Sequence, residues 1–263
     1  LSCLEQTNLS IAEELNIRTD AVIVNQCNKW AYTESKQSGY TLKMIHVKQR
    51  GLTQSRNMAL SYASGDICVL CDDDVKYVDN YDEIILQAFT DLPQADIIVF
   101  NINRKNYNGN VASIEKMKQT PFFKSYGSVR IAFRLEKIKK QNIWFDSNFG
   151  AGSTYTSGEE SLFLQKARKK GLSIWEHPAI IAEVDFSTST WREGYNEKFF
   201  YDKGALLNAM YPCSKYLLQF YYVMRLRSLT TLSTTNMLKW MMRGMRGHKR
   251  LEQYSDYVNR NLL

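Results

Sequence analysis

Three consecutive aspartates, Asp72, Asp73 and Asp74, follow an apolar run directly in the stretch GDICVLCDDDVKYVDN. Two unit charges about 4 Å apart repel by roughly 4 kcal/mol at an effective dielectric near 20, so an uncompensated triplet beside a buried strand is costly. Asp72 and Asp74 have the D-x-D spacing that suits a hard divalent cation, which would in turn hold a diphosphate. The alternative is a solvated turn before the next helix. The triplet therefore indicates either a cation site or a polar turn.

The apolar run is one of four strands that the first hundred residues predict, at 21–26, 43–48, 66–71 and 96–102. Helices are expected between them, at about 8–16, 54–63 and 80–91. The strands are apolar on both faces, which is typical of a sheet covered by helices. This alternation predicts an α/β fold with a Rossmann-like, mostly parallel central sheet. Ligands of open α/β sheets bind beyond the carboxyl ends of the strands, which is where Asp72 to Asp74 lie.

The second half of the chain is less regular. SVRIAFRLEKI (128–138) fits either a strand or the start of a helix, whereas SGEESLFLQKARKKG (157–171) has the signals of a complete helix. A short strand follows, and the chain reads helical from about residue 195. We therefore predict a catalytic domain over 1–195 and a helical extension over 196–263, packed on that domain or on a membrane.

The composition favours anionic partners. Lys and Arg number 34 against 27 Asp and Glu, a formal net charge of +7, which suits nucleotides, nucleic acid or an acidic membrane surface. The five cysteines are odd in number and lie mostly in apolar surroundings, which predicts reduced thiols and a cytosolic setting. Cys68 and Cys71 have redox-motif spacing, but their place inside ICVLC favours the strand core. We expect neither a cleaved export signal nor a membrane-spanning segment.

A family resemblance emerges from the segment QRGLTQSRNMALSYASGD (49–66), which precedes the aspartate strand. RGLTQSRN, followed by GD and then DDD, resembles the pattern of family-2 glycosyltransferases, enzymes of the nucleotide-diphospho-sugar transferase (GT-A) fold. That pattern is a G-x-x-x-x-R-N segment, a helix, G-(D/E) and a strand that ends in D-x-D. The resemblance covers roughly residues 1–190.

The resemblance implies roles for the residues around the triplet. Asp72 would lie against the nucleotide ribose and the metal, Asp74 would coordinate Mn²⁺ or Mg²⁺, and Asp73 would assist. Arg56 would lie near the diphosphate, a role that suits its planar, permanently charged guanidinium group. Its alternative is an ordinary arginine on the helix surface. Two further residues of the same segment are assigned to nucleotide binding, namely Gly51 and Asn57.

In the family, the ends of the first two strands embrace the base. The matching positions here are all polar: Gln6, Thr7, Asn8, Asn25 and Gln26. The family commonly has an acidic pair at the second strand end, so the two amides Asn25 and Gln26 are a departure. An amide still offers both a donor and an acceptor to a uracil edge. For Gln6 and Gln26, the alternative is that they are polar turn residues at the strand ends.

The pair Glu159-Glu160 matches the acidic pair that opens a helix and supplies the catalytic base in inverting members of the family. One carboxylate takes the proton of the acceptor hydroxyl while that oxygen attacks the anomeric carbon, and the metal stabilises the departing nucleoside diphosphate. Glu160 matches the usual base by position. However, Ser157-x-x-Glu160 also reads as a capping box, which would leave Glu159 as the base. Both glutamates are therefore candidates.

Two further features have open alternatives. Asp185 lies where many relatives carry a histidine that completes the metal site, so it is either a metal ligand or the cap of the following turn. The segments KYLLQFYYVMRLRS and NMLKWMMRGMRGHKR interleave apolar, aromatic and basic residues. Such helices suit the interface of an anionic membrane, or a helix pair with its basic face in water.

The resemblance implies a metal-dependent, inverting, hexosyltransferase-type enzyme. It would move a sugar from a nucleoside diphosphate donor to a hydroxyl of a glycan or lipid-linked acceptor, and the favoured donor is a UDP-sugar. The pathway would be bacterial capsule or surface-polysaccharide synthesis. The location would be the cytosol, including the inner face of the plasma membrane. One alternative is a nucleotidyltransferase of similar fold, although LEQTNLS lacks the glycine-rich basic loop. The other is a basic nucleic-acid-binding domain, although three aspartates at the ligand edge would repel a phosphate backbone, so no nucleic-acid partner is expected.

Overall fold

The computed structural model describes residues 1–37, 39–106, 113–122, 124–185 and 194–261. The chain divides into two units. The N-terminal unit comprises Leu1–Phe145 and Phe163–Ser189, and the C-terminal unit comprises Asp146–Leu162 and Thr190–Leu263. Each unit is described by itself. The functional division into a catalytic domain and an extension stays a prediction.

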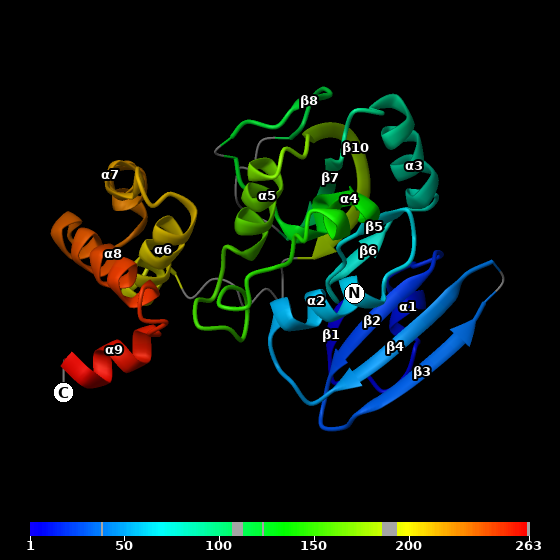
Figure 1. The fold of residues 1–263 in the computed structure, drawn as a ribbon, viewed down its shortest axis with the longest axis horizontal. Coiled ribbons are helices and arrows are strands. Elements are labelled where there is room, and N and C mark those ends of the chain that lie inside the picture. The colour runs from blue at the N-terminus through cyan, green and yellow to red at the C-terminus, as the bar shows by residue number, and fades with distance from the viewer. Residues whose placement is uncertain (38, 107–112, 123, 186–193, 262–263) are drawn as a thin grey trace. The chain divides into compact units, whose positions relative to one another are not determined.

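The first sheet of the N-terminal unit has the order β1-β2-β4-β3 (Figure 1). Its strands are β1 (Ser2–Leu4), β2 (Ala21–Gln26), β3 (Ala31–Lys36) and β4 (Thr41–Val47). β1, β2 and β4 run parallel, as the alternation of strands and helices predicts, and β3 is an antiparallel edge strand. Two helices belong to this part of the chain, α1 (Ile11–Glu14) and α2 (Leu52–Tyr62). α1 is a single turn, shorter than expected.

The second sheet has the order β5-β9-β7-β10-β6, with β8 paired to β10. Its strands are β5 (Ile67–Val69), β6 (Val75–Tyr77), β7 (Ile97–Lys105), β8 (Lys118–Gln119), β9 (Ile131–Arg134) and β10 (Ile174–Asp185). β7 and β10 run parallel, and the other pairs are antiparallel. A parallel bridge between Ser2 and Asp72 joins the two sheets. The aspartate triplet therefore lies where the sheets meet.

The stretch 128–138, which fits either a strand or a helix by sequence, is both. A 3₁₀ turn, η1 (Ser128–Arg130), leads into β9, and α4 (Leu135–Lys140) follows without a gap. β9 pairs antiparallel with β5, so the strand before the aspartates lies against a segment more than sixty residues later in the chain. A partner at that distance leaves no trace in the local apolar pattern.

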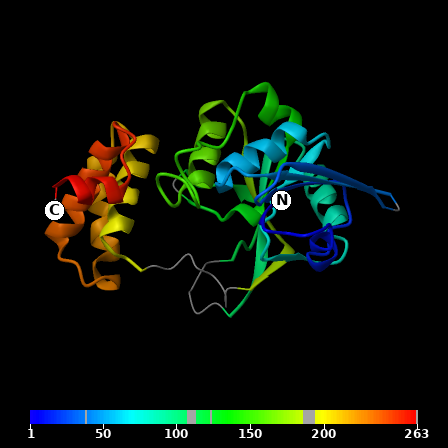
Figure 2. The ribbon, with the colours of Figure 1, turned by 90° about the horizontal axis from the view of Figure 1, so that it is seen from below.

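Helices cover both faces of the second sheet (Figure 2). Alternate residues of a strand point to opposite faces, and along β7 they join two different buried clusters. Ile98 and Phe100 pack with residues of α1 and of α3 (Tyr81–Asp91), whereas Ile97 and Val99 pack with residues of α4 and of α5 (Glu159–Lys169). This arrangement confirms the predicted α/β class.

The C-terminal unit is helical, as expected. It contains α6 (Glu197–Met210), α7 (Lys215–Leu226), the 3₁₀ turn η2 (Arg227–Leu229), α8 (Thr234–His248) and α9 (Tyr254–Asn261). α6 and α8 approach closely at glycines, because a Cβ on Gly204 would lie 2.0 Å from the Met241 carbonyl oxygen and one on Gly244 1.8 Å from that of Tyr201. Within the described ranges, every helix is too short or too polar to pass through a bilayer.

Candidate functional site

Asp72 is the anchored member of the aspartate triplet. Its two carboxylate oxygens accept hydrogen bonds from Arg56 Nη2 at 2.7 and 3.0 Å, and Oδ2 also accepts one from Ser128 Oγ at 2.5 Å. Arg56 is buried and its guanidinium carbon lies 5.6 Å from the centre of the Phe145 ring. Burial by itself raises the pKa of Asp72, but the Arg56 charge and these hydrogen bonds outweigh it, so the pKa is lowered. Asp72 is therefore an ionised carboxylate held in one orientation.

Asp73 and Asp74 have a different environment, because both side chains reach solvent. Partial desolvation, followed by the charge of Asp72, raises the pKa of Asp73. The same causes, together with the charge of Asp73, raise the pKa of Asp74 to about 6. Carboxylates that repel one another and face solvent gain from a cation placed between them. Arg56 thus supplies the positive charge that compensates the Asp72 carboxylate, whereas the carboxylates of Asp73 and Asp74 face outward.

Asp185 is the last residue of β10 and lies at the edge of the sheet where Asp74 precedes β6. β10 pairs with β6 through Val184 and Val75, so one further step in this register brings Asp185 opposite Asp74. The Asp185 side chain is exposed and accepts a hydrogen bond from Asn106 Nδ2 at 2.9 Å. No cluster of three or more His, Cys, Asp or Glu side chains suited to a metal ion exists in the part of the chain that the structure describes.

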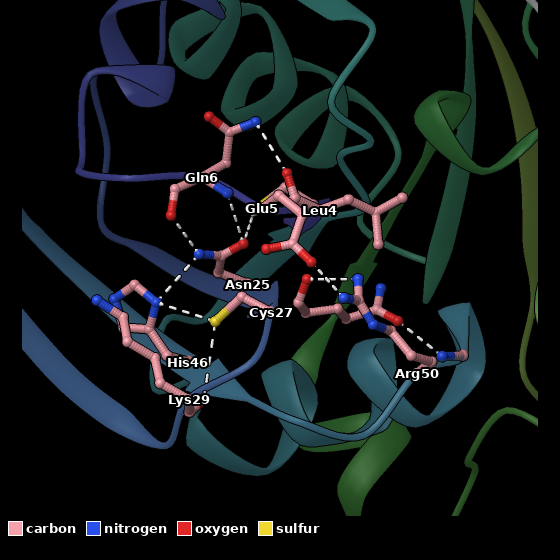
Figure 3. Close-up of polar contacts among 11 residues, drawn as sticks. Leu4, Glu5, Gln6, Asn25, Cys27, Lys29, His46 and Arg50 are labelled. Atoms are coloured by element: carbon pink, nitrogen blue, oxygen red, sulfur yellow. Dashed lines mark hydrogen bonds and ion pairs between the residues drawn. The ribbon is translucent and has the colours of Figure 1, made fainter.

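Asn25 holds the chain that leaves β1 (Figure 3). It is fully buried, its Oδ1 accepts from the Gln6 backbone N–H at 2.9 Å, and its Nδ2 donates to the Gln6 carbonyl oxygen at 2.6 Å. Asn25 Nδ2 also lies 3.0 Å from His46 Nδ1, which lies 3.6 Å from Cys27 Sγ. Burial, and then the charge of Lys29, lowers the pKa of His46. The Asn25 amide is therefore engaged with the protein itself.

Gln26 holds the loop before α2 in the same way. Its Oε1 accepts from the Gly51 backbone N–H at 2.7 Å, and its Nε2 donates to Ser2 Oγ at 3.2 Å. Its carbonyl oxygen accepts from Arg50 Nη1 at 2.8 Å, and Arg50 also pairs with Glu5 (Figure 3). Of the five polar residues predicted to embrace the base, Asn25 and Gln26 are buried and hold loops. Gln6 is half-buried, and two are exposed, Thr7 and Asn8.

Gly51 and Asn57 position α2. Gly51 has φ of +134°, a conformation that residues with a Cβ rarely adopt, and immediately precedes the helix. Asn57 Nδ2 donates to the Phe145 carbonyl oxygen at 3.0 Å, and Asn57 Oδ1 accepts from the Phe145 N–H at 2.9 Å. Among the described residues, the buried Gln54 Oε1 has no hydrogen-bond partner. The contact of Gly51 and Asn57 with a nucleotide stays a prediction. In the structure, the Asn57 side chain fixes the Phe145 backbone.

The predicted catalytic pair lies at the start of α5. The helix begins at Glu159, so Gly158, with φ of +109°, takes the preceding position that the capping-box interpretation assigns to Ser157. Glu159 is buried and Glu160 is half-buried. The loop before them is tied within the C-terminal unit: Asp202 on α6 accepts from Thr156 N at 3.2 Å, Thr156 Oγ1 at 2.7 Å and Lys198 Nζ at 2.9 Å.

Three site residues escaped the sequence interpretation. Ser128 lies 56 positions from its partner Asp72, inside the stretch whose secondary structure was open. Asp202 lies in a helix that shows nothing but its amphipathic pattern. Of the three, His46 could have been predicted as a site residue, because it lies near the carboxyl end of a predicted strand. Cys68, by contrast, lies in β5 and Cys71 lies just beyond its end, and burial raises the pKa of their thiols to about 11 and about 12, as expected of core cysteines.

Comparison with known proteins identifies one family and one set of similar folds. The family model described as Glycosyl transferase family 2 matches residues 2–157, more than half of the chain. No curated protein matches the sequence. Among solved structures, the chain is similar to S. aureus TarS 1-349 in complex with UDP-GlcNAc, with 15% identity and a TM-score of 0.57 over 98% of this chain and 91% of that chain.

Two other crystal structures of the same protein give similar values. S. aureus TarS 1-349 alone has 14% identity and a TM-score of 0.56 over 96% of this chain and 92% of that one. The complex with UDP has 16% identity and a TM-score of 0.52 over 91% of this chain and 65% of that one. The chain spans 45% of a longer TarS chain. At these identities the likeness concerns the fold alone.

Proposed function

The chain belongs to glycosyl transferase family 2, and we propose that it transfers a sugar from a nucleoside diphosphate donor, with a UDP-sugar as the first candidate, to a hydroxyl group of a glycan or lipid-linked acceptor. The observation that carries this proposal is the anchored Asp72 beside two solvent-facing carboxylates where the two sheets meet. The TarS structures, which share the fold, contain UDP and UDP-GlcNAc. Capsule or surface-polysaccharide synthesis on the cytoplasmic side is the corresponding setting.

The donor set suits a hard divalent cation, Mn²⁺ or Mg²⁺. Such ions are held by one or two carboxylates together with phosphate oxygens and waters, so a cage of three protein ligands is not required. We assign Asp74 as the principal ligand, with Asp73 and Asp185 as its acidic neighbours. Asp72, whose oxygens already accept bonds from Arg56 and Ser128, serves mainly to hold the strand end and face the ribose. When bound, the cation would offset the negative charge of the diphosphate.

The base side of the donor site is the chain that follows β1. Asn25 holds Gln6 by both backbone groups, so the exposed Thr7 and Asn8 start from a fixed point. Gln26 holds Gly51 on the neighbouring loop. Preorganised loops lower the entropy that a ligand must offset on binding. Asn25 and Gln26 thus support the base site by fixing its walls, and Thr7 and Asn8 are the exposed candidates for direct contact.

The catalytic base is assigned to Glu160. A general base must approach the acceptor hydroxyl within about 3 Å, and Glu160 is more accessible than the buried Glu159. The acceptor oxygen forms its bond to the anomeric carbon as the bond from that carbon to the diphosphate oxygen breaks. The hydroxyl proton passes to the Glu160 carboxylate, and the nucleoside diphosphate leaves with the bonding electron pair. Attack opposite the leaving group inverts the anomeric configuration.

A thermal-shift experiment tests the donor assignment. The protein is melted with UDP, GDP, CMP or single-stranded DNA, each with and without Mn²⁺. We expect UDP to raise the melting temperature, and to raise it further with Mn²⁺. Asp74→Asn should lose only the Mn²⁺-dependent part, whereas Asp66→Asn, away from the triplet, should keep both. Stabilisation by DNA alone, or an unchanged Mn²⁺ response in Asp74→Asn, would refute the assignment.

Hydrolysis or transfer of a nucleotide sugar tests the base. Glu160→Gln should still bind UDP with Mn²⁺ but lose at least about 100-fold in turnover, the scale of general-base catalysis. Glu159→Gln is the matched variant one position away. If Glu160→Gln remains fully active while Glu159→Gln is inactive and folded, the base is Glu159.

A further inference from the structure

Helix α7, which is labelled in Figure 1, has a large apolar face made of exposed side chains. Five side chains, each between 39% and 73% exposed, make up this face, which we call the α7 face: Tyr216, Leu217, Phe220, Tyr221 and Met224. Their spacing of i, i+1, i+4, i+5 and i+8 places them on one side of the helix. Scattered exposed apolar residues are ordinary, but a contiguous row on one helix indicates a binding surface.

The opposite side of α7 fixes the rotation of the helix. Gln219 is buried and its Nε2 donates to the Leu238 carbonyl oxygen on α8 at 2.8 Å. Val223, one turn further on, is completely buried in the core of the C-terminal unit. A helix held in this way cannot turn the α7 face inward without breaking the Gln219 hydrogen bond and exposing Val223.

The part of the chain that contains α7 carries charge of one sign. Residues 203–251 contain nine Lys or Arg residues and neither Asp nor Glu, although the whole chain has 27 acidic residues. Arg225 and Arg227 are exposed at the carboxyl end of α7. The occupant of this face must therefore combine an apolar phase with negative charge. An anionic lipid bilayer has both, since its acyl chains take apolar side chains and its headgroups attract arginine.

A second copy of the chain fits this surface less well. A symmetric contact would bring the α7 faces together and, with them, two sets of the same positive charges. Nucleic acid would suit the charge but offers no apolar phase for Leu217 and Met224. Tyrosine is also a residue that favours the boundary between headgroups and acyl chains. We propose that α7 lies in the interface of an anionic membrane, with the α7 face against the acyl chains and Arg225 and Arg227 at the headgroup phosphates.

Co-sedimentation of the full chain with vesicles tests this surface. Vesicles of phosphatidylcholine alone are compared with vesicles of phosphatidylcholine and phosphatidylglycerol, at low and high salt. We expect binding to the anionic vesicles that weakens with salt, because charge contributes. Arg225→Gln/Arg227→Gln should weaken binding about 25-fold, since each basic residue near the surface contributes about fivefold. Leu217→Ser/Phe220→Ser should weaken it at least about tenfold.

Leu86→Ser is the matched control, because Leu86 is also a large exposed apolar residue but lies on α3 in the N-terminal unit. It should bind vesicles like the unaltered chain. All variants should still unfold cooperatively and keep donor hydrolysis, so a failure here leaves the transferase assignment intact. Equal binding to neutral and anionic vesicles, no binding to either, or unchanged binding by Leu217→Ser/Phe220→Ser would overturn the proposal. So would a dimer in ultracentrifugation that these two substitutions dissociate, because the α7 face would then join two copies.

Discussion

At the scale of single residues, the site depends on polar groups that the protein satisfies internally. Four of its side chains form hydrogen bonds with distant parts of the chain, namely those of Arg56, Ser128, Asn25 and Gln26. Buried polar groups of this kind are costly to leave unpaired, so each substitution has a defined consequence. Thr7, Asn8, Asp73 and Asp74, by contrast, are exposed to solvent, as is Asp185.

Removing the partner of Asp72 should destabilise the N-terminal unit. Arg56→Ala leaves a partly buried carboxylate without its cation, and we expect a loss of about 3 kcal/mol in the free energy of unfolding near pH 7. The pKa of Asp72 is lowered in the folded protein, so the pair stabilises the fold above the ordinary pKa of 3.8, and the contribution is lost as the pH falls further. The difference between variant and unaltered protein should shrink in acid.

Urea unfolding from pH 7 to pH 3 measures this difference. Lys105→Ala is the control, because Lys105 forms an exposed pair with Glu183, and such a pair should contribute little to stability. If both alanine variants lose the same small amount, Asp72 does not depend on Arg56.

Asn25→Asp would place an acidic residue where the family commonly has one, but the observed contacts oppose it. An ionised carboxylate offers no donor, so its oxygen would face the Gln6 carbonyl oxygen, now 2.6 Å from Asn25 Nδ2. We expect a loss of about 1 to 3 kcal/mol in stability. The loss should be smaller at pH 5.5 than at pH 8. A protonated carboxyl group could donate to the Gln6 carbonyl oxygen, and a protonated His46 could donate to the new carboxylate.

Chemical denaturation at the two pH values tests this expectation, with Asn8→Asp as the matched control. Asn8 is exposed and its Oδ1 accepts from the Ser10 N–H at 2.8 Å, a bond that an aspartate also accepts. Equal effects of the two substitutions would show that burial of Asn25 is unimportant.

At the scale of elements, the start of α5 and the packing of α6 are the sensitive points. Gly158 precedes Glu159 and Glu160, and both its positive φ and the nearby Leu206 side chain disfavour a larger residue. α6 contributes Asp202, which ties Thr156, and Lys203, which lies over the Tyr222 ring of α7. α6 therefore shapes the chain that leads into the predicted catalytic pair, Glu159 and Glu160.

Gly158→Ala should cost about 2 to 4 kcal/mol in stability and reduce turnover. The φ of +109° strains a residue with a Cβ, and that Cβ would lie 2.6 Å from Leu206 Cδ1. Gly171→Ala separates the two causes, because Gly171 has φ of +81° and open space around its Cβ position. Calorimetry and donor hydrolysis should show a smaller stability loss and normal turnover in that control. Equal stability losses would mean that the Leu206 contact is harmless.

Lys203→Met should stabilise the C-terminal unit at pH 7. Burial, and then the charge of Arg225, lowers the pKa of Lys203 to about 8, so folding disfavours its charged form. Between pH 8 and 10.5 the unfolded chain holds more protons than the folded one, so the penalty is complete below pH 8 and fades as the pH rises. The gain from Lys203→Met should fade over the same range.

Melting temperatures at pH 7, 9 and 10.5 measure the gain. Lys239→Met, on the exposed side of α8, should change stability by less than about 0.5 kcal/mol at every pH. A gain from Lys203→Met that stays constant up to pH 10.5 would rule out the charge as its cause.

At the scale of the whole molecule, the chain has separately built cores. The two clusters of the N-terminal unit lie on opposite faces of β7, and a third cluster fills the C-terminal unit. Proteins open in cooperative parts of this size, so a defect in one core need not spread to another. The proposed donor site belongs to the N-terminal unit and the α7 face to the C-terminal unit.

Gly244→Val should loosen the C-terminal unit selectively. Its Cβ would lie 1.8 Å from the Tyr201 carbonyl oxygen, so α8 and α6 must move apart. We expect faster hydrogen exchange in α6 and α8, by about 10-fold or more, with β2 and β4 unchanged. Gly127→Val is the control, because nothing lies within 4 Å of its Cβ position. Equally faster exchange in β2 and β4 would show that the two cores open together.

The sequence by itself determined the α/β class, the four early strands, the helical C-terminal part and the position of the aspartates at a strand end. Those features depend on neighbouring residues, whose apolar spacing and charge can be read locally. The same local signals carried the family resemblance, which the match over residues 2–157 confirms.

Only the tertiary structure decided which polar residues are buried and which face solvent. Asn25 and Thr7 look equally suited to a base by sequence, but one is enclosed and the other exposed. Ser128 reaches Asp72 across 56 positions, and Gln219 turns the α7 face outward through a contact with α8. The physical reason is that burial and hydrogen bonding depend on contacts between distant parts of the chain, which no local pattern of residue types encodes.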